Sequence, residues 1–394
     1  MNVAYVIVRY GPEVVGGAEL GCRMLAERLA ARPGWSVEVF TTCALESSTW
    51  ADHFLPGTTD INGVTVHRFV SERGRDRRFA KRVVPVDEPS ERQLQWIDWQ
   101  GPVCPAVLEG AAASRADLVI FYPYLYWPTV HGIPLVAERA VLHPAAHDEP
   151  ALQLGIFART FALPRGFVFQ TDSERRLVEA RFPSVTARPQ LRLGLGVSDG
   201  VGAAADGVGA AADDAFTKRY GLEGVPFLLC LGRVDEAKGA PLLASFFLTY
   251  KTRRPGPLKL VFAGPVVDEP PAHPDVVVTG PLPEAMKWSA LRAATVLVSP
   301  SPFEAFSIVL MEAWTAGRPV LVHGRAQATL EHVRRSGGGL AFHGYADFET
   351  EVDRLVADGA LRETLGEAGR RYVEANFSWD RLIERYANWL ERLT

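Results

Sequence analysis

The stretch Pro300–Trp314, PSPFEAFSIVLMEAW, carries two glutamates eight positions apart, Glu304 and Glu312. Glu312 falls in an apolar run that predicts the buried face of a helix, where an ionised carboxylate is costly to desolvate without a partner. If Ser307 opens this helix, Glu304 lies on the preceding loop and Glu312 about one and a half turns inside. The pair would then span on the order of 10 Å. The competing interpretation is one capping acid and one incidental buried acid.

Length and composition set the broad class. The chain has 394 residues, which predicts two domains of similar size, and its 47% hydrophobic and 22% charged residues are typical of a globular protein. The formal net charge of −4 gives no electrostatic reason to expect nucleic-acid binding. The apolar run 3–8 is too short for a signal peptide, and no run reaches the ~20 residues of a spanning helix. We therefore expect a cytoplasmic protein, with four free thiols at Cys22, Cys43, Cys104 and Cys230.

Short runs rich in valine, isoleucine and phenylalanine alternate with helical stretches in both halves, which predicts mostly parallel sheets buried on both faces. The expected strands are residues 3–8, 36–41, 64–69, 118–121, 140–143 and 167–170, then 227–231, 258–263, 276–279, 295–299 and 319–322. Expected helices in the second half are 240–251, 283–293, 307–316 and 326–335.

A nearly repeated Gly/Ala-rich segment around residue 200 has nothing to bury and predicts a linker at 199–215. We expect a domain at 1–198, a second at 199–376 and a final helix at 377–394. Together these features predict an α/β fold of two doubly wound, Rossmann-like domains.

A loop directly after the strand 227–231 holds two cations. It reads Gly232-Arg233-Val234-Asp235-Glu236-Ala237-Lys238-Gly239. At the carboxyl end of a parallel strand, Arg233 and Lys238 can converge on one diphosphate. Solvated surface charge is the alternative.

With these motifs, and with Ala313-Trp314 and Gly317-Arg318-Pro319-Val320, the chain resembles the retaining glycosyltransferases of family 4. The resemblance is dense from about residue 227 to 394 and sparse before it. It implies the GT-B fold, with two domains facing across a cleft and the last helix crossing back to the first domain. The usual family pattern has glycine where Ser307 stands, which predicts a slightly smaller pocket and a different sugar.

The resemblance assigns roles to single residues. Glu304 would face the donor sugar hydroxyls and Glu312 the nucleotide ribose, while Arg233 and Lys238 would clamp the donor phosphates. The backbone amides around Ser307 would face the same phosphates, at Phe306, Ser307 and Ile308.

Three more positions follow from the resemblance. A Gly-Gly after the first strand, Gly16-Gly17, would face the donor phosphate and the acceptor, although glycines at such a turn also serve packing alone. In the loop 143–150, His147 would contact the donor sugar or the charge at the anomeric centre, the alternative being a histidine satisfied in the core. Leu282 would lie near the nucleotide base.

The expected reaction is transfer of a sugar from a nucleotide-sugar donor to a saccharide or lipid-linked saccharide, in surface polysaccharide assembly. The acceptor hydroxyl would attack on the face that the phosphate leaves, so no protein nucleophile is needed. The cations and backbone amides would stabilise the leaving phosphate, and the sequence shows no Asp-x-Asp pair for a metal, so neither metal nor cofactor is expected.

Other interpretations stay open. The chain could be an epimerase or hydrolase of sugar nucleotides with the same fold, or a catalytically silent donor-binding partner subunit, or it could glycosylate a small natural product. Residues 68–82 carry six closely spaced cations from Arg73 to Arg82. We interpret them as a solvated loop; the alternative is peripheral contact with anionic lipid at the inner face of the plasma membrane, or a grip on a phosphate-bearing acceptor.

Overall fold

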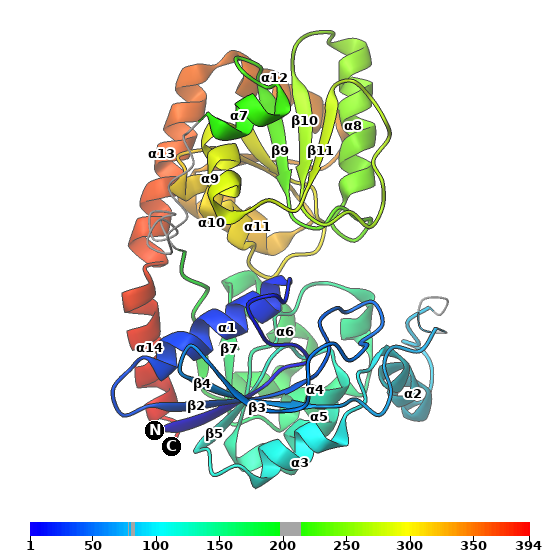
Figure 1. Cartoon of the computed structure of the whole chain (residues 1–394), viewed down its shortest axis with the longest axis vertical. Coiled ribbons are helices and arrows are strands. Elements are labelled where there is room, and N and C mark those ends of the chain that lie inside the picture. Colours follow the sequence, from blue (N-terminus) through cyan, green and yellow to red (C-terminus); the bar gives the residue numbers. More distant parts are fainter. Residues whose placement is uncertain (78, 80–82, 198–213) are drawn as a thin grey trace. The chain divides into compact units, whose positions relative to one another are not determined.

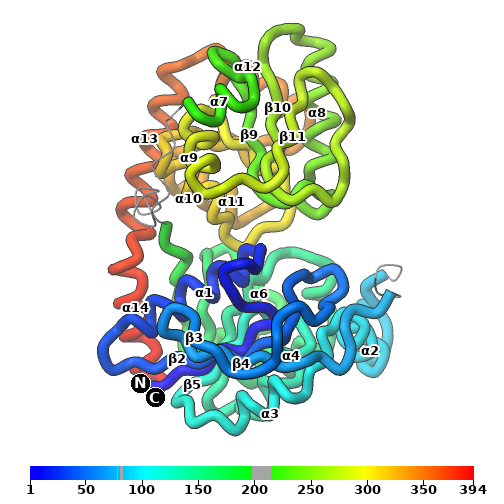
Figure 2. Tube along the Cα trace, in the orientation of Figure 1, coloured from blue at the N-terminus to red at the C-terminus, as the bar shows by residue number. Residues whose placement is uncertain are grey.

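The computed structural model describes residues 1–77, 79, 83–197 and 214–394. The chain divides into two compact units, of which unit 1 comprises Met1–Gly194 with Asp380–Thr394, and unit 2 comprises Leu195–Trp379. Figure 2 follows the chain from unit 1 into unit 2 and back to its C-terminal segment, shown in red. Most of the linker expected at 199–215 lies outside the described residues.

Unit 1 is built on one sheet (Figure 1). Its strands are β1 (Asn2–Val6), β2 (Ser36–Thr42), β3 (Gly57–Ile61), β4 (Val64–Phe69), β5 (Leu118–Phe121), β6 (Ala140–Leu142), β7 (Gly166–Phe169) and β8 (Gln190–Arg192). Among the described residues they lie in the order β3-β4-β2-β1-β5-β6-β7-β8. All neighbours pair in parallel except β3, which is antiparallel to β4. The strand order reverses between β1 and β5.

Helices cover this sheet because the strands are apolar on both faces; every residue of β5 and β7 is buried. The helices of unit 1 are α1 (Gly17–Ala30), α2 (Ser90–Gln100), α3 (Pro105–Ala113), α4 (Trp127–Gly132), α5 (Phe157–Ala162) and α6 (Asp172–Arg181). One hydrophobic cluster joins strands β1, β5, β6 and β7 to residues of α2, α3, α4 and α5.

The last helix, α14 (Trp379–Glu391), belongs to unit 1 from Asp380 onward. Its buried residues recur at helical spacing and make it amphipathic: Leu382, Ile383, Tyr386, Ala387, Trp389 and Leu390. The hydroxyl of Tyr386 lies 2.8 Å from Nε2 of His143 and 3.1 Å from the hydroxyl of Tyr5. This buried polar chain fixes α14 to the ends of β1 and β6.

Unit 2 has a sheet whose described pairs are all parallel. Its strands are β9 (Phe227–Leu231), β10 (Lys259–Ala263), β11 (Val276–Gly280), β12 (Val296–Ser299), β13 (Val320–His323) and β14 (Gly339–Phe342), in the order β11-β10-β9-β12-β13-β14. The order reverses between β9 and β12. In open α/β sheets, ligands bind outside the carboxyl ends of the strands at such a reversal.

The helices of unit 2 are α7 (Ala215–Tyr220), α8 (Ala240–Arg253), α9 (Glu284–Ala293), α10 (Ile308–Thr315), α11 (Gln327–Ser336), α12 (Tyr345–Ala357) and α13 (Gly359–Asn376). A hydrophobic cluster joins α8 and α12 to the central strands. Trp314 of α10 is buried, and its indole nitrogen donates to the Gly338 carbonyl at 2.8 Å. A Cβ at Gly369 of α13 would collide with this indole, so a glycine lets the two helices approach.

Candidate functional site

Lys238 and Glu304 meet at the strand reversal of unit 2. Lys238 follows β9 and Glu304 follows β12, the two parallel neighbours at which the order turns. Nζ of Lys238 lies 2.6 Å from Oε1 of Glu304. Gly239 brings the chain into place, since its φ is +76° and a Cβ there would lie 2.5 Å from the Pro300 carbonyl oxygen. Two loops 66 positions apart in sequence thus present a cation and a carboxylate side by side.

Asp235 organises the first of these loops. One of its carboxylate oxygens accepts from the Arg233 guanidinium, and the other accepts from the Lys238 backbone nitrogen at 2.8 Å. Asp235 is buried, whereas the side chains of Arg233 and Lys238 are partly exposed. The carboxylate therefore anchors the loop while both cations remain accessible to a ligand.

Glu312 lies inside α10 and is buried, as its apolar surroundings predict. Its partner is Lys287 in the first turns of α9, with Nζ 2.6 Å from Oε1 of Glu312 and 2.8 Å from Oε1 of Glu284. Burial raises the pKa of Glu312, and the nearby ammonium of Lys287 opposes this shift. The ammonium of Lys287 thus compensates the charge of the Glu312 carboxylate, which can still accept a hydrogen bond from a ligand hydroxyl.

Ser307 occupies the N-cap position of α10 but does not cap it. Its backbone is left-handed, with φ of 73°, and its side chain makes no capping hydrogen bond. The buried Ser307 hydroxyl finds no partner among the described residues. Ser307 therefore opens α10 by position, as expected, but its side chain does not cap the helix. A left-handed position favours glycine, the residue of the usual family pattern.

The other predicted residues of unit 2 lie around this helix start. Phe306 is buried, and its ring packs against those of His332 and Phe377, so its side chain belongs to the core. Ile308 is the first residue of α10 and is partly buried. Leu282 is partly buried in the loop between β11 and α9.

In unit 1, Gly16 and Gly17 stand at the start of α1. A Cβ at Gly16 would lie 2.1 Å from Oε2 of Glu19, so glycine makes room for that carboxylate. Glu19 is buried and accepts from Nε of Arg9 at 3.0 Å. Gly17 has open space where a Cβ would stand. The first glycine thus serves the Arg9–Glu19 pair, and the second leaves the helix start accessible.

The two histidines of the loop after β6 differ. His143 is buried against Tyr122 and Tyr386, and burial lowers its pKa to about 3, so it is a neutral core residue. The side chain of His147 is partly exposed, with Nδ1 3.8 Å from Oε1 of Glu149. Glu149 also accepts from the Tyr124 hydroxyl at 2.8 Å. The predicted residue His147 is thus accessible to a ligand, whereas His143 is not.

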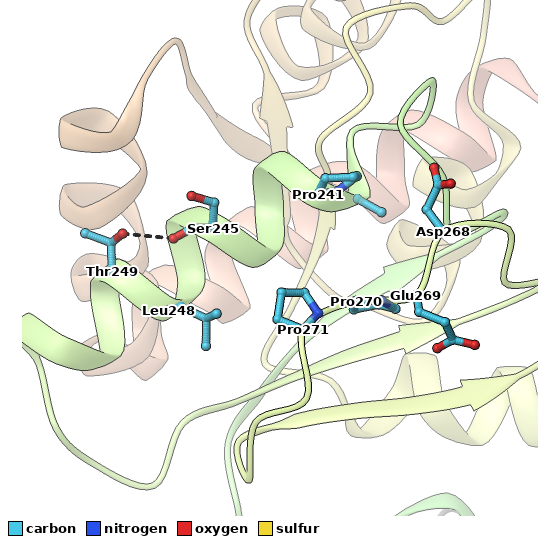
Figure 3. A pocket seen from close by; sticks show the side chains of 9 residues that line it. Pro241, Ser245, Leu248, Thr249, Asp268, Glu269, Pro270 and Pro271 are labelled. Carbon is cyan, nitrogen blue, oxygen red and sulfur yellow. Dashed lines mark hydrogen bonds between the residues drawn. The ribbon is translucent and has the colours of Figure 1, made fainter.

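Figure 3 shows a pocket on unit 2 between α8 and the loop that follows β10. Its walls include Pro241 and Leu248 of α8, and Asp268 and Pro271 of the loop. Predicted donor residues such as Arg233, Lys238 and Glu304 do not line it. We therefore place the candidate site at the strand reversal and not in this pocket.

Sequence reasoning missed the partners of the predicted residues. Asp235 lies in the loop 232–239, and its position between Arg233 and Lys238 in the sequence could have indicated that it pairs with them. Lys287 gives a weaker signal, a lysine in the first turns of the helix after Leu282. The pairing of Arg9 with Glu19 depends on a contact that spacing alone does not reveal.

Within the described ranges, no three His, Cys, Asp or Glu side chains group as a metal site would require. In the same part of the chain, no helix combines the length and apolarity needed to cross a membrane.

Comparisons with known proteins agree with this architecture. Residues 213–372 match the family model of "Glycosyl transferases group 1". The D-inositol 3-phosphate glycosyltransferase of Arthrobacter sp. (strain FB24) is 27% identical over 401 residues, which cover 93% of this chain and 87% of that relative.

Solved structures match along the whole chain. Sucrose-phosphate synthase from Thermosynechococcus elongatus aligns with a TM-score of 0.71 at 17% identity, covering 100% of this chain and 98% of that one. An E. coli structure described as trehalose-6-phosphate bound with UDP-2-fluoro glucose aligns with a TM-score of 0.73 at 12% identity, with both chains covered completely. The fold prediction is thereby confirmed. The chain has the GT-B fold, and the similarity of residues 213–372 to the group 1 glycosyl transferases supports a glycosyltransferase.

Proposed function

We propose that this chain is a retaining, metal-independent glycosyltransferase that moves a sugar from a nucleotide-sugar donor to a saccharide or lipid-linked saccharide in surface polysaccharide assembly. The observation that carries the proposal is the contact of Lys238 with Glu304 at the strand reversal of unit 2. In a nucleotide sugar, the distal phosphate and the sugar are directly bonded. An ammonium and a carboxylate 2.6 Å apart can therefore bind adjacent phosphate and hydroxyl groups.

The remaining residues fit the rest of such a donor. Arg233, anchored by Asp235, would bind the second phosphate of the diphosphate, and Glu312 would accept from the ribose hydroxyls. When the bond from sugar to phosphate breaks, negative charge grows on the phosphate. Arg233 and Lys238 would stabilise this charge without a metal ion. The leaving phosphate would take the proton of the acceptor hydroxyl, which attacks from the same face, so the anomeric configuration is retained.

The acceptor is the less constrained half of the proposal. The name of the Arthrobacter relative puts inositol phosphates among the acceptors to test beside saccharides, lipid-linked saccharides and small natural products. We assign acceptor choice to unit 1, because Arg233, Lys238, Glu304 and Glu312 all lie in unit 2. His147 and the opening of α1 at Gly17 are the unit 1 residues that we assign to the reacting sugar and phosphate.

The test is to incubate the pure protein with UDP-, GDP-, ADP- and dTDP-sugars and to follow nucleotide release with and without acceptors. The proposal expects release that depends on an acceptor, persists in EDTA, and gives a product whose anomeric proton coupling in NMR matches the donor's configuration. Donor turnover without any acceptor would favour the hydrolase or epimerase. Donor binding without turnover would favour the silent partner subunit.

A further inference from the structure

Arg75 of unit 1 is held in a fixed position by two aromatic rings. The guanidinium carbon lies 5.1 Å from the centroid of the Trp50 ring and 4.8 Å from that of Phe79. The backbone nitrogen of Arg75 donates to the Thr49 carbonyl at 2.8 Å, and that of Asp76 donates to the Trp99 carbonyl at 2.8 Å. Trp50 is itself buried, and its indole nitrogen donates to the Gln100 carbonyl. The side chain of Arg75 is therefore preorganised.

This guanidinium has no anionic partner among the described residues. Its Nε atom is sealed from solvent without a hydrogen bond, and no described carboxylate forms an ion pair with Arg75. The nearby positions outside the described ranges, 78 and 80–82, are Arg, Ala, Lys and Arg in the sequence and bring no carboxylate. Burial lowers the pKa of Arg75; the nearby Tyr126 opposes this shift, and the positive charge of Arg9 adds to it. A partly buried charge without a counter-ion is costly, which indicates that a ligand supplies the anion.

The residues around Arg75 supply a further hydrogen-bond donor, the Tyr126 hydroxyl, and no net negative charge. Arg9 is paired with Glu19, so these two charges cancel and the charge of Arg75 is in excess. Tyr126 packs edge-on against Trp50 with ring centroids 5.4 Å apart, and its hydroxyl donates to no described residue. Burial and the Glu19 charge raise the pKa of Tyr126 to about 12, so its hydroxyl keeps a proton to donate.

The strands explain why these side chains meet. Arg9 follows β1, Trp50 follows β2, Arg75 follows β4 and Tyr126 follows β5, and these four parallel strands are neighbours in the sheet. All four residues thus lie beyond carboxyl ends, around the reversal between β1 and β5. The fold places ligand sites at this edge.

We propose that Arg75 and Tyr126 form a subsite for a phosphate group on the acceptor, a proposal that rests on the transferase function proposed above. The planar guanidinium can bind two phosphate oxygens at once, and the phenol can donate to a third. The diphosphate of the donor has its cations in unit 2, Arg233 and Lys238. A separate uncompensated cation in unit 1 therefore suits an anion on the other substrate.

The first experiment measures binding alone, with inorganic phosphate and with glucose 6-phosphate as probes in calorimetry on the full chain. Arg75→Gln is expected to weaken binding about 10- to 100-fold, as for a lost charge-assisted contact. Tyr126→Phe, which keeps the ring packed on Trp50, is expected to weaken it by about 3- to 10-fold. Arg73→Gln is the matched control, because Arg73 is exposed and lies 3.9 Å from Asp98. Equal binding by wild type, Arg75→Gln and Tyr126→Phe would overturn the subsite.

The second experiment separates this subsite from the donor site. With a phosphorylated acceptor, Arg75→Lys and Arg75→Gln should raise the acceptor KM, lysine less than glutamine, while the donor KM stays unchanged. With the unphosphorylated counterpart the same variants should match wild type. Loss of activity that is equal for both acceptors, or a raised donor KM, would contradict the assignment. Failure of the transferase proposal is distinct, because then wild type itself releases no nucleotide with any acceptor.

The source of the phosphate is resolved by two further acceptors. Sugar monophosphates and a short-chain lipid diphosphate saccharide in detergent both carry the required group, and the one whose KM depends on Arg75 identifies the physiological class. Sedimentation with phosphatidylglycerol vesicles tests a membrane surface instead. If Arg75→Gln abolishes vesicle binding while neither phosphorylated acceptor depends on Arg75, the acceptor subsite is refuted.

Discussion

At the scale of the residue, Lys238 is the cation with the clearest expected effect. Its ammonium contacts Glu304, and its backbone nitrogen is held by Asp235. Because the ammonium would stabilise charge that develops on the leaving phosphate, Lys238→Ala should lower kcat on the order of 10²- to 10³-fold. The circular dichroism spectrum and melting temperature should stay near wild type, since the side chain is partly exposed.

The measurement for Lys238→Ala is nucleotide release under saturating donor. Lys218→Ala is the matched control, because Lys218 is an exposed lysine of the same unit that pairs with Asp214. A Lys238→Ala variant as fast as Lys218→Ala would remove Lys238 from the site.

Ser307 carries two local costs. A left-handed backbone at a non-glycine residue costs roughly 1 kcal/mol, and a buried hydroxyl without a partner costs about 1–3 kcal/mol. Replacing Ser307 with glycine removes both costs. The greater conformational entropy of glycine in the unfolded chain offsets only about 0.5–1 kcal/mol of this gain in stability. Ser307→Gly should therefore raise the free energy of unfolding by about 1 kcal/mol in urea titrations.

Ser336→Gly is the comparison variant, for which we expect a decrease in the free energy of unfolding. Ser336 ends a helix, and its hydroxyl accepts from the Gly338 nitrogen at 2.9 Å, so this change should destabilise. If Ser307→Gly destabilised the protein as well, the hydroxyl of Ser307 would have a partner that the described contacts lack.

Residue types and short spacings predicted which side chains to examine, and tertiary pairing decided what each one does. Spacing placed Arg233 and Lys238 after a strand, and the structure joins Lys238 to Glu304. The sequence grouped the cations of 68–82 as one basic stretch, but burial separates them. Arg68 is buried and donates to the Tyr10 carbonyl at 2.8 Å, whereas Arg75 pairs with no carboxylate in the part of the chain that the structure describes. Only long-range contacts distinguish these roles.

At the scale of the element, the central strands were predictable, whereas of the edge strands only β11 was predicted. Residues 64–69, 118–121 and 227–231 form strands with the predicted bounds. Residues 118–121 are buried on both faces of the sheet, 64–69 are buried at alternate positions, and the first three residues of 227–231 are buried. Strand β3 has the sequence GTTDI and is mostly exposed, and β14 follows two glycines. Such segments form strands because they pair with a neighbouring strand, and the local sequence pattern does not predict this pairing. Helices α12 and α13 were likewise not predicted.

The docking of α14 should depend on pH through His143. Burial lowers the pKa of His143 from 6.5 to about 3, so between these values the unfolded chain binds a proton that the folded chain does not. The contribution of His143 to the free energy of unfolding of unit 1 should therefore be greatest above pH 6.5 and decrease as the pH drops toward 3. His143→Phe keeps a ring at this position and leaves Tyr386 hydrogen bonded to Tyr5, so its slope in this range should be shallower.

Urea unfolding at several pH values, followed by tryptophan fluorescence, measures this slope. His343→Asn is the control, because His343 is an exposed histidine of unit 2 and its loss should leave the slope unchanged. Parallel slopes for wild type and His143→Phe would show that His143 does not carry the effect.

At the scale of the whole molecule, the two ends of the chain belong to one unit. Met1–Gly194 and Asp380–Thr394 share unit 1, while Leu195–Trp379 forms unit 2 with its own sheet and its own hydrophobic cluster. The predicted donor residues Arg233, Lys238, Glu304 and Glu312 all lie in unit 2, whereas Arg75 and Tyr126 lie in unit 1. The division of the chain thus separates the charged residues assigned to the nucleoside diphosphate from those assigned to the acceptor phosphate. His147 and Gly17, which we assign to the reacting sugar and phosphate, lie in unit 1.

This division predicts that the two kinds of ligand act on different thermal transitions. A nucleoside diphosphate should bind unit 2 and, at about 100 times its Kd, stabilise it by about 2.7 kcal/mol, which raises the melting temperature by several degrees. Differential scanning calorimetry with UDP, GDP and ADP measures the shift, and Lys238→Ala should reduce it. His143→Phe identifies the transition of unit 1, because it loosens α14 from that unit. Suppose instead that a nucleotide raises the melting temperature of unit 1, the transition that His143→Phe lowers, and leaves that of unit 2 unchanged. The donor site would then lie in unit 1, which contradicts the assignment of Arg233, Lys238 and Glu312 to donor binding.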